Sequence, residues 1–170
     1  IHSSDNMCVT LSLSNKFINA TNYTIAINGI TDCNANALLP NTKSFSCYKA
    51  QPYDVVINEL MPDPDPAINL PNEEYVELKN RTNFSINLKN WNFSNLTSSK
   101  KIPDITIVPN GYVLLVGSGV AGQFLSNFGI IAYEVPSFPS LLNSGTTITL
   151  RDSNDVMISS VTYSSSWYND

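Results

Sequence analysis

The sequence has little positive charge and no cluster of basic residues. Nine Lys and Arg residues stand against 14 Asp and Glu residues, which gives a formal net charge of −5. Phosphate binding requires clustered basic side chains. Only Lys100 and Lys101 are adjacent in the sequence, and we interpret that pair as part of a solvated loop. We therefore expect no nucleic-acid partner.

The sequence also lacks a long apolar run. The longest, residues 112–116, has the length of one strand, whereas about 20 apolar residues are needed to cross a bilayer as a helix. We expect no insertion into a membrane. The sequence starts at Ile1 and contains no signal peptide, so we interpret it as a fragment or processed form whose targeting segment lies elsewhere.

Histidine is nearly absent, and this weighs against nucleophilic catalysis. A Ser-His-Asp or Cys-His arrangement would have to use His2, close to a chain end where residues are often poorly ordered. A pair of carboxylates among residues 63–77 could in principle supply acid and base. Prolines surround these acids, however, and Glu74 and Glu77 need not share a strand face. We expect no catalytic site and no enzyme activity.

The acidic loop suggests one metal site. Asp63 and Asp65 lie two residues apart in a loop with four prolines, and Glu73 follows the loop. Calcium takes six to eight oxygen ligands, which such side chains and nearby carbonyls can supply. The alternatives are a calcium site and a plain acidic surface loop. The sequence predicts no other cofactor, and zinc has no support because Cys8, Cys33 and Cys47 form no C-x-x-C pair.

Alternation of apolar and polar residues runs through most of the chain and predicts strands. Before Gln51 it predicts strands at residues 8–13, 23–27 and 43–48. After Pro52 it predicts strands at residues 54–60, 75–79, 86–88, 91–93, 105–108, 112–116, 146–150 and 156–163. The single segment with helical character is 120–128. Short, regularly spaced strands are typical of an all-β sandwich or barrel.

Asparagine is the most conspicuous surplus. It occurs 22 times and creates six N-x-S/T sequences, which begin at Asn19, Asn22, Asn80, Asn83, Asn92 and Asn95. Such sequences are glycan acceptors in eukaryotic secreted proteins. An asparagine-rich chain also produces them by chance, and we favour that interpretation.

From residue 54 onward the order of segments resembles a bacterial lamin-tail domain. V-V-I-N-E-L, which contains Asn58 and Glu59, matches the opening strand of that family. E-E-Y-V-E-L-K-N, which contains Glu77, and I-N-L-K-N-W, which ends at Trp91, match the next two segments. The resemblance implies an immunoglobulin-like β-sandwich over residues 54–170, a type that occurs in bacteria as a module of secreted proteins.

We interpret the four matched residues, Asn58, Glu59, Glu77 and Trp91, as structural. Asn58 and Glu59 are expected to bond to the backbone of a neighbouring loop near a strand end. Trp91 lies among alternating apolar residues and is expected in the core, whereas Trp167 is the tryptophan expected at the surface.

The first 50 residues resemble the closing strands of a bacterial immunoglobulin-like domain, on Y-T-I-A-I, G-I-T-D-C and Phe45. The strand order of that family implies a disulfide between Cys8 and Cys33 and a buried free thiol at Cys47. Three strands cannot close a sandwich. We therefore expect an open sheet edge or an exposed apolar face in residues 1–50, and we expect these residues to lie against a neighbouring molecule or to pack on the lamin-tail-like unit.

The sequence thus predicts two units, an incomplete immunoglobulin-like unit over residues 1–50 and a lamin-tail-like sandwich over residues 54–170. We expect a non-catalytic structural or interaction module of a larger, secreted or cell-surface bacterial protein. Its partners would be other domains of the same polypeptide, other surface proteins or a second copy. The alternatives are an accessory domain of a secreted hydrolase, such as a nuclease or phosphatase, and a calcium- or glycan-binding module.

Overall fold

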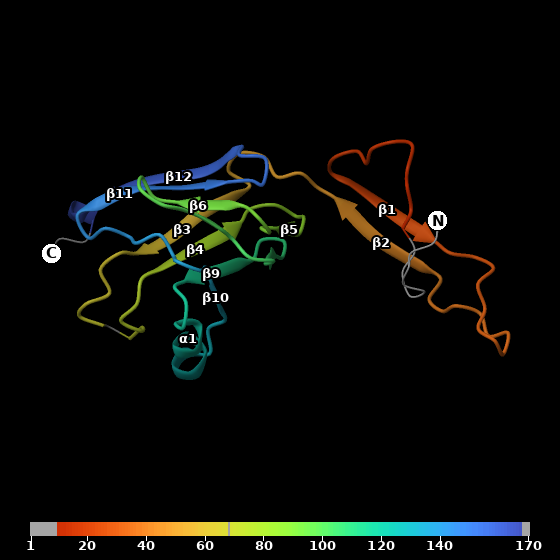
Figure 1. Cartoon of the computed structure of the whole chain (residues 1–170), viewed down its shortest axis with the longest axis horizontal. Helices are drawn as coiled ribbons and strands as arrows, with labels where there is room; N and C mark the ends of the chain where they lie inside the picture. The colour runs from red at the N-terminus through yellow and green to blue at the C-terminus, as the bar shows by residue number, and fades with distance from the viewer. Residues whose placement is uncertain (1–9, 68, 168–170) are drawn as a thin grey trace. The chain divides into compact units, whose positions relative to one another are not determined.

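The computed structural model describes residues 10–67 and 69–167, and strands dominate it (Figure 1). The chain divides into two compact units, one ending at Lys49 and one beginning at Ala50. Within the described residues, no helix is both long and apolar enough to span a membrane.

The N-terminal unit is built on one antiparallel pair, β1 (Thr21–Ala26) and β2 (Thr42–Cys47). Tyr23 and Phe45 stand opposite each other across the pair, and their rings stack with centroids 5.7 Å apart. Phe17 packs edge-on against both rings, at 4.7 and 5.2 Å. Cross-strand aromatic contacts of this kind stabilise a register.

The strand expected at residues 8–13 is not formed over residues 10–13. Leu11 and Leu13 are 62% and 59% exposed, and their backbone belongs to no sheet. Alternation alone does not make a strand, because the backbone also needs a hydrogen-bonding partner and the side chains need a surface to cover. Cys8 and Val9 lie outside the described residues.

The C-terminal unit contains two four-stranded sheets, ordered β10-β9-β4-β3 and β12-β11-β6-β7. The first comprises β3 (Val55–Met61), β4 (Tyr75–Asn80), β9 (Tyr112–Val116) and β10 (Ala132–Glu134). The second comprises β6 (Asn92–Ser94), β7 (Ser99–Lys101), β11 (Gly145–Arg151) and β12 (Met157–Ser164). A small pair, β5 (Ile86–Asn87) and β8 (Thr106–Ile107), and the 3-10 turn η1 (Ser165–Trp167) complete the unit.

Both sheets contribute fully buried side chains to one core. Val76 and Leu78 come from β4, and Phe93, Ile148 and Leu150 come from the second sheet; all are 0% exposed. They alternate with more exposed neighbours, as the period of two requires. The all-β class predicted from alternation is confirmed, and of the sandwich and the barrel that alternation left open, the structure is the sandwich.

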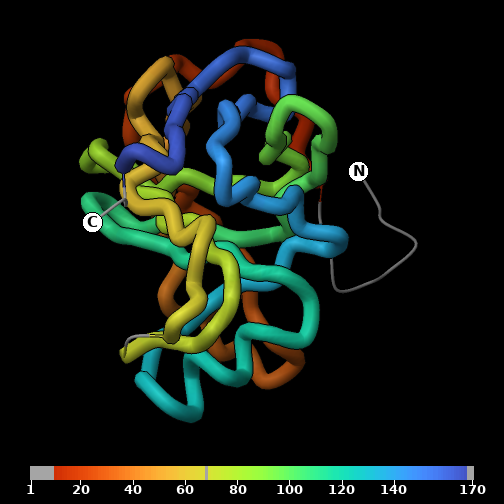
Figure 2. Tube along the Cα trace, turned by 90° about the vertical axis from the view of Figure 1, so that its left-hand side faces the viewer, coloured from red at the N-terminus to blue at the C-terminus, as the bar shows by residue number. Residues whose placement is uncertain are grey.

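The outer face of the first sheet, which points away from the second sheet, carries the helix α1 (Ala121–Phe128) (Figures 1 and 2). Phe124 of α1 is fully buried against Tyr75, Leu114 and Val116. The helix and its flanks connect β9 to β10, and these two strands are parallel. A parallel pair needs such a crossover connection.

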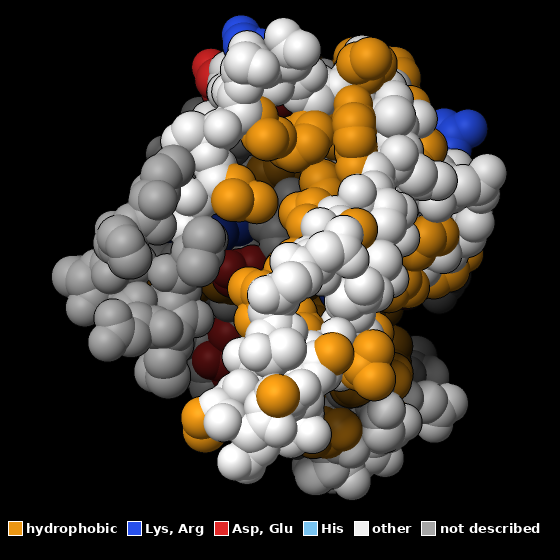
Figure 3. Space-filling view, turned by 90° about the vertical axis from the view of Figure 1, so that its right-hand side faces the viewer, with side chains coloured by type: hydrophobic (Ala, Val, Ile, Leu, Met, Phe, Trp, Pro, Cys, Tyr) orange, Lys and Arg blue, Asp and Glu red, His pale blue; other side chains and the backbone are white. Residues whose placement is uncertain are grey.

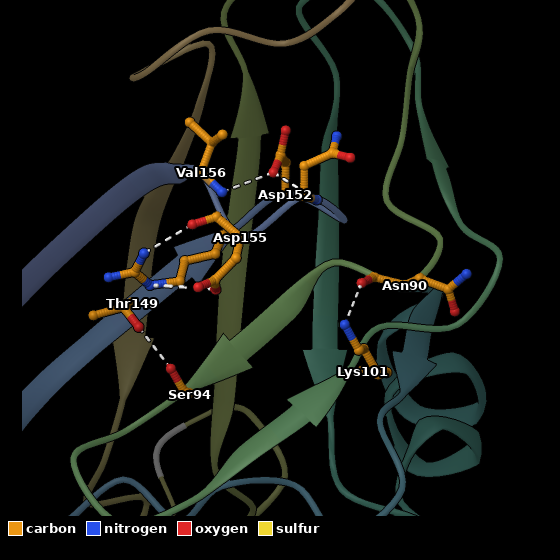
Figure 4. Close-up of polar contacts among 9 residues, drawn as sticks. Asn90, Ser94, Lys101, Thr149, Asp152, Asp155 and Val156 are labelled. Atoms are coloured by element: carbon orange, nitrogen blue, oxygen red, sulfur yellow. Dashed lines mark hydrogen bonds and ion pairs between the residues drawn. The ribbon is translucent and has the colours of Figure 1, made fainter.

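The strands predicted at residues 146–150 and 156–163 are β11 and β12, which form an antiparallel hairpin joined by a turn that Asp152 organises (Figure 4). Asp152 is 4% exposed. One of its carboxylate oxygens accepts the backbone N–H groups of Asn154 and Val156, both at 2.8 Å. Arg151 reaches over the turn and donates to the carbonyl of Asp155 at 2.9 Å. The acceptor side chain therefore supplies the bonds that the turn backbone lacks.

The basic pair Lys100-Lys101, which we interpreted as a loop, lies in β7. β7 pairs with β6, and the hydroxyls of Ser94 in β6 and Thr149 in β11 meet at 2.6 Å (Figure 4). Lys101 donates to the carbonyl of Asn90 at 3.0 Å. The loop interpretation was wrong because pairing with a neighbour, rather than apolar content, forms this strand.

Candidate functional site

Two glutamates face each other on the outer face of the first sheet. Glu59 in β3 and Glu77 in β4 are direct cross-strand partners, and the register shifts at Asn58, between Ile57 and Glu59. The shift is a β-bulge, which re-aims the side chains that follow it. It brings two like charges opposite each other, an arrangement that ordinarily destabilises a sheet.

Neutral donors bind both carboxylates. The Tyr75 hydroxyl donates to Glu59 at 2.5 Å, and the Asn58 amide donates to Glu77 at 2.7 Å. We had expected Asn58 and Glu59 to bond to the backbone of a neighbouring loop; their partners are instead side chains of β4. Burial raises the pKa of Tyr75, and the hydrogen bond to Glu59 and the charges of Glu59 and Glu77 raise it further. Tyr75 is therefore a neutral donor at physiological pH.

A hollow of about 280 Å³ opens beside these two glutamates; we call it the outer-face pocket. Its walls are formed by the sheet, by α1 and by the segment between α1 and β10. The residues that line it are Glu59, Leu70, Tyr75, Glu77, Tyr112, Val113, Leu114, Phe124, Ile130 and Ile131.

The charge in the outer-face pocket is not neutralised within the described part of the chain. The ion pairs found there are Lys89 with Asp104 and Arg151 with Asp155. Lys79 lies on the same strand as Glu77, but its ammonium group sits over the ring of Tyr112, 4.9 Å from the ring centre. The pocket thus combines aromatic and aliphatic walls with two acidic groups.

The sequence indicated part of this pocket. Alternation in β4 places Tyr75, Glu77 and Lys79 on one face, opposite Val76 and Leu78. The walls contributed by Phe124, Ile130 and Ile131 were missed, because nothing in the local pattern shows on which face of the sheet α1 packs.

The acidic loop residues do not converge. Asp63 and Asp65 are exposed, and Glu73 is half-buried and accepts a bond from the amide of Gln123 at 3.2 Å. Across residues 10–67 and 69–167, no group of three His, Cys, Asp or Glu side chains is placed to hold a metal ion. Calcium binding at this loop stays a prediction.

The tryptophans and cysteines singled out in the sequence do not form one site. Trp91 is 5% exposed and Trp167 is 65% exposed. Cys33 is exposed, Cys47 is half-buried and not fully buried as expected, and the two are not bonded to each other. Cys8, the other half of the predicted disulfide, lies outside the described residues, and so does His2.

The N-terminal unit carries a second, larger hollow, which we call the apolar groove. It has a volume of about 730 Å³, and among its lining residues are Leu11, Leu13, Phe17, Ile18, Tyr23, Ile25 and Phe45. Ile18 is 70% exposed and Ile25 is 38% exposed. Figure 3 shows apolar side chains gathered on this unit.

The chain matches a protein-family model. The model of the family described as the Lamin Tail Domain matches residues 49–165, from the end of the N-terminal unit through β12. No curated protein matches the chain.

Proposed function

Because the chain belongs to the lamin-tail domain family, a family of immunoglobulin-like structural domains, we propose that it is a non-catalytic interaction module of a larger secreted or cell-surface bacterial protein. In this role the C-terminal sandwich is a stable structural unit, and the N-terminal unit makes the contact with a partner. The partner is another domain of the same polypeptide, another surface protein or a second copy of the chain.

The observation that carries the proposal is the apolar groove. Its residues Leu11, Leu13, Ile18 and Ile25 are each between 38% and 70% exposed, on a unit whose described sheet has two strands. A two-stranded sheet is marginal in water unless something covers its apolar face. Exposed apolar patches on otherwise polar proteins commonly mark interaction sites. We therefore assign partner binding to this face.

The polar groups of the C-terminal sandwich support a structural role. Asp152 and Asn80 are buried, and both hold turn or loop backbone. Glu59 and Glu77 are bonded to neutral donors, and the described residues that line the outer-face pocket include no histidine or cysteine. This arrangement favours a scaffold over acid–base chemistry.

Sedimentation velocity on the full chain tests the proposal. We expect the weight-average mass to rise with concentration, and the double variant Leu11→Thr/Ile25→Thr to remain monomeric under the same conditions. Leu96→Thr is the matched control, because Leu96 is 76% exposed in the other unit; it should behave like the unmodified chain. A chain that stays monomeric excludes a second copy as the partner, and association that is unchanged by both substitutions contradicts the contact role of this face.

One feature favours glycan binding as the second candidate. Trp167 is 65% exposed and lies near Tyr163, with ring centroids 6.4 Å apart. Exposed aromatic rings can stack on sugars. A glycan array probed with the full chain and with Trp167→Ala tests this candidate, and binding that survives the substitution rules out a site at Trp167. A calorimetric titration with calcium tests the acidic loop in the same way.

A further inference from the structure

We propose that the outer-face pocket binds the side chain of an arginine presented by a partner protein. The proposal goes beyond the interaction role assigned above, since it concerns the other unit and names the chemistry of the contact. It does not depend on the apolar groove, and either can fail without the other.

The shape and lining of the pocket fit a long side chain with an apolar stem. The floor and walls include Tyr75, Leu114 and Phe124, which are buried, and Ile131, which is 66% exposed at the rim. Arginine buries its methylene groups on apolar surface while its charged head reaches polar atoms. The pocket volume of about 280 Å³ is that of a single side-chain site and not of a large organic ligand.

The charge in the pocket calls for a cation. Glu59 and Glu77 repel each other across the strand pair, and their hydrogen bonds from Tyr75 and Asn58 each use one carboxylate oxygen, Oε1. Within the described residues, neither Oε2 atom has a bonded partner, although an ionised carboxylate accepts about four hydrogen bonds. A bound cation would use those acceptors and relieve the repulsion between the two carboxylates.

Guanidinium matches this arrangement better than ammonium or a metal ion. Its planar fork carries five donors, which can reach two neighbouring carboxylates at once, and its flat face stacks on a ring such as Tyr112. A hard metal ion requires six or more oxygen ligands, whereas most of the lining is apolar. We therefore assign arginine as the occupant.

Lys79 gives the proposal a directional test. Its ammonium lies over the Tyr112 ring, so it occupies the face on which guanidinium would stack, and it repels an incoming cation. Lys79→Gln is expected to strengthen arginine binding about two- to fivefold, which is the size of effect one exposed charge pair produces. A purely structural role for Lys79 would not produce that gain.

The experiment is an amide-resolved NMR titration of the full chain. The probe is N-acetyl-arginine amide. N-acetyl-citrulline amide is the neutral control of the same shape, and N-acetyl-lysine amide is the charged control. We expect arginine amide to shift signals of residues 59, 77, 112 and 130–131, and citrulline amide to leave them in place. Glu77→Gln should weaken binding about three- to tenfold. Asp63→Asn, which removes the same charge from an exposed loop, should not.

Several results would overturn the assignment. These are equal shifts with citrulline amide, equal affinity for lysine amide, shifts spread over the surface without focus on the pocket, or an affinity unchanged by Glu77→Gln. The amide spectrum of each variant reports whether it is folded. If Glu77→Gln does not fold, Lys79→Gln and Glu59→Gln carry the same test. Because the sedimentation experiment uses other residues and another readout, its outcome is separate.

Discussion

Asn80 shows what the surplus of asparagine does in this fold. Its side chain is fully buried, and its amide donates to the carbonyls of Phe84, Ile107 and Val108 at 2.7, 3.2 and 3.1 Å. Its carbonyl accepts from the backbone and the hydroxyl of Thr82. Although Asn80 begins an N-x-S/T sequence, its side chain is part of the core and is not available to an enzyme that attaches glycans.

Substitution of Asn80 should therefore be costly. Asn80→Ala leaves three carbonyls and Thr82 without this partner, and one buried unsatisfied group alone costs about 1–3 kcal/mol. We expect the free energy of unfolding, measured with urea, to fall by about 3 kcal/mol. Asn72→Ala is the control at an exposed loop position; it should change stability by less than about 0.5 kcal/mol. A small effect at Asn80 would show that water replaces its bonds.

Glu74 is the residue whose charge opposes folding. Burial raises its pKa above the ordinary value of 4.5, although the backbone N–H of Leu141 and the hydroxyl of Ser140 donate to it and lower the pKa in part. The folded state thus binds the proton more tightly than the unfolded state. Ionisation of Glu74 in the folded state therefore lowers the free energy of unfolding at neutral pH. This loss of stability disappears as the pH falls through the raised pKa to about 4.5.

Glu74→Gln should remove that cost, because the amide oxygen still accepts the Leu141 N–H. We expect the variant to be at least as stable as the unmodified chain at pH 7, with a difference that shrinks as the pH approaches 4.5. Urea unfolding at a series of pH values measures the difference. If the gap grows at low pH, the ionised form is the one that the fold stabilises.

At the scale of elements, the Asp152 turn sets the register of the longest hairpin. Asp152→Ala removes the acceptor of two backbone N–H groups. We expect it to lower the free energy of unfolding by about 2 kcal/mol. Asp152→Asn keeps an acceptor oxygen in place and should cost less than half as much. Equal losses in the two variants would mean that the charge, rather than the hydrogen bonds, holds the turn.

Strands with clear alternation could be predicted from the sequence, and strands formed by pairing alone could not. β9 occupies the expected residues, 112–116, and β4 extends the expected strand by one residue to Asn80. β7 contains Ser99, Lys100 and Lys101 and has no apolar face of its own. β10 pairs in parallel with β9, which depends on how α1 crosses the sheet. The periodicity of apolar residues indicates which side chains face the core, but it does not indicate which strands pair with each other.

The sequence likewise predicted some residues of the candidate site but not their arrangement. Asn58, Glu59 and Glu77 were identified from the family motif and assigned structural roles. The sequence could not show that a bulge aligns Glu59 with Glu77, or that α1 and the residues after it build a wall beside them. Both depend on long-range packing. For the same reason residues 10–13 do not form a strand, although apolar and polar residues alternate there.

At the scale of the whole molecule, the alternation of apolar and polar residues is interrupted at Gln51 and Pro52. The two compact units divide next to this point, between Lys49 and Ala50. The lamin-tail resemblance was correct for the larger unit, and the family match begins at residue 49. The immunoglobulin-like origin of the first 50 residues and the Cys8–Cys33 bridge stay predictions. A mass spectrum of the unreduced chain after proteolysis would show whether that bridge exists.

The first and last strands of the sandwich run side by side. The Tyr53 N–H donates to the carbonyl of Ile158 at 2.7 Å, and the Ile57 N–H donates to the hydroxyl of Ser159 at 3.3 Å. Further along, residues 57–60 and Val161 line one shallow hollow with Trp167. Both strands therefore advance in the same direction, toward the end of the unit where η1 lies (Figure 1).

This arrangement determines how the unit responds to tension. A pull between residues 50 and 167 loads β3 and β12 in shear, so their contacts must break together. A pull between residues 50 and 154 starts from one end and peels the strands apart one contact at a time. We expect optical-tweezers unfolding at the same loading rate to need a clearly higher force for the first pair of handles, since forced unfolding reports the barrier. Equal forces would place the mechanical barrier elsewhere in the sandwich. A β-sandwich with this geometry transmits load along these two strands and resists extension.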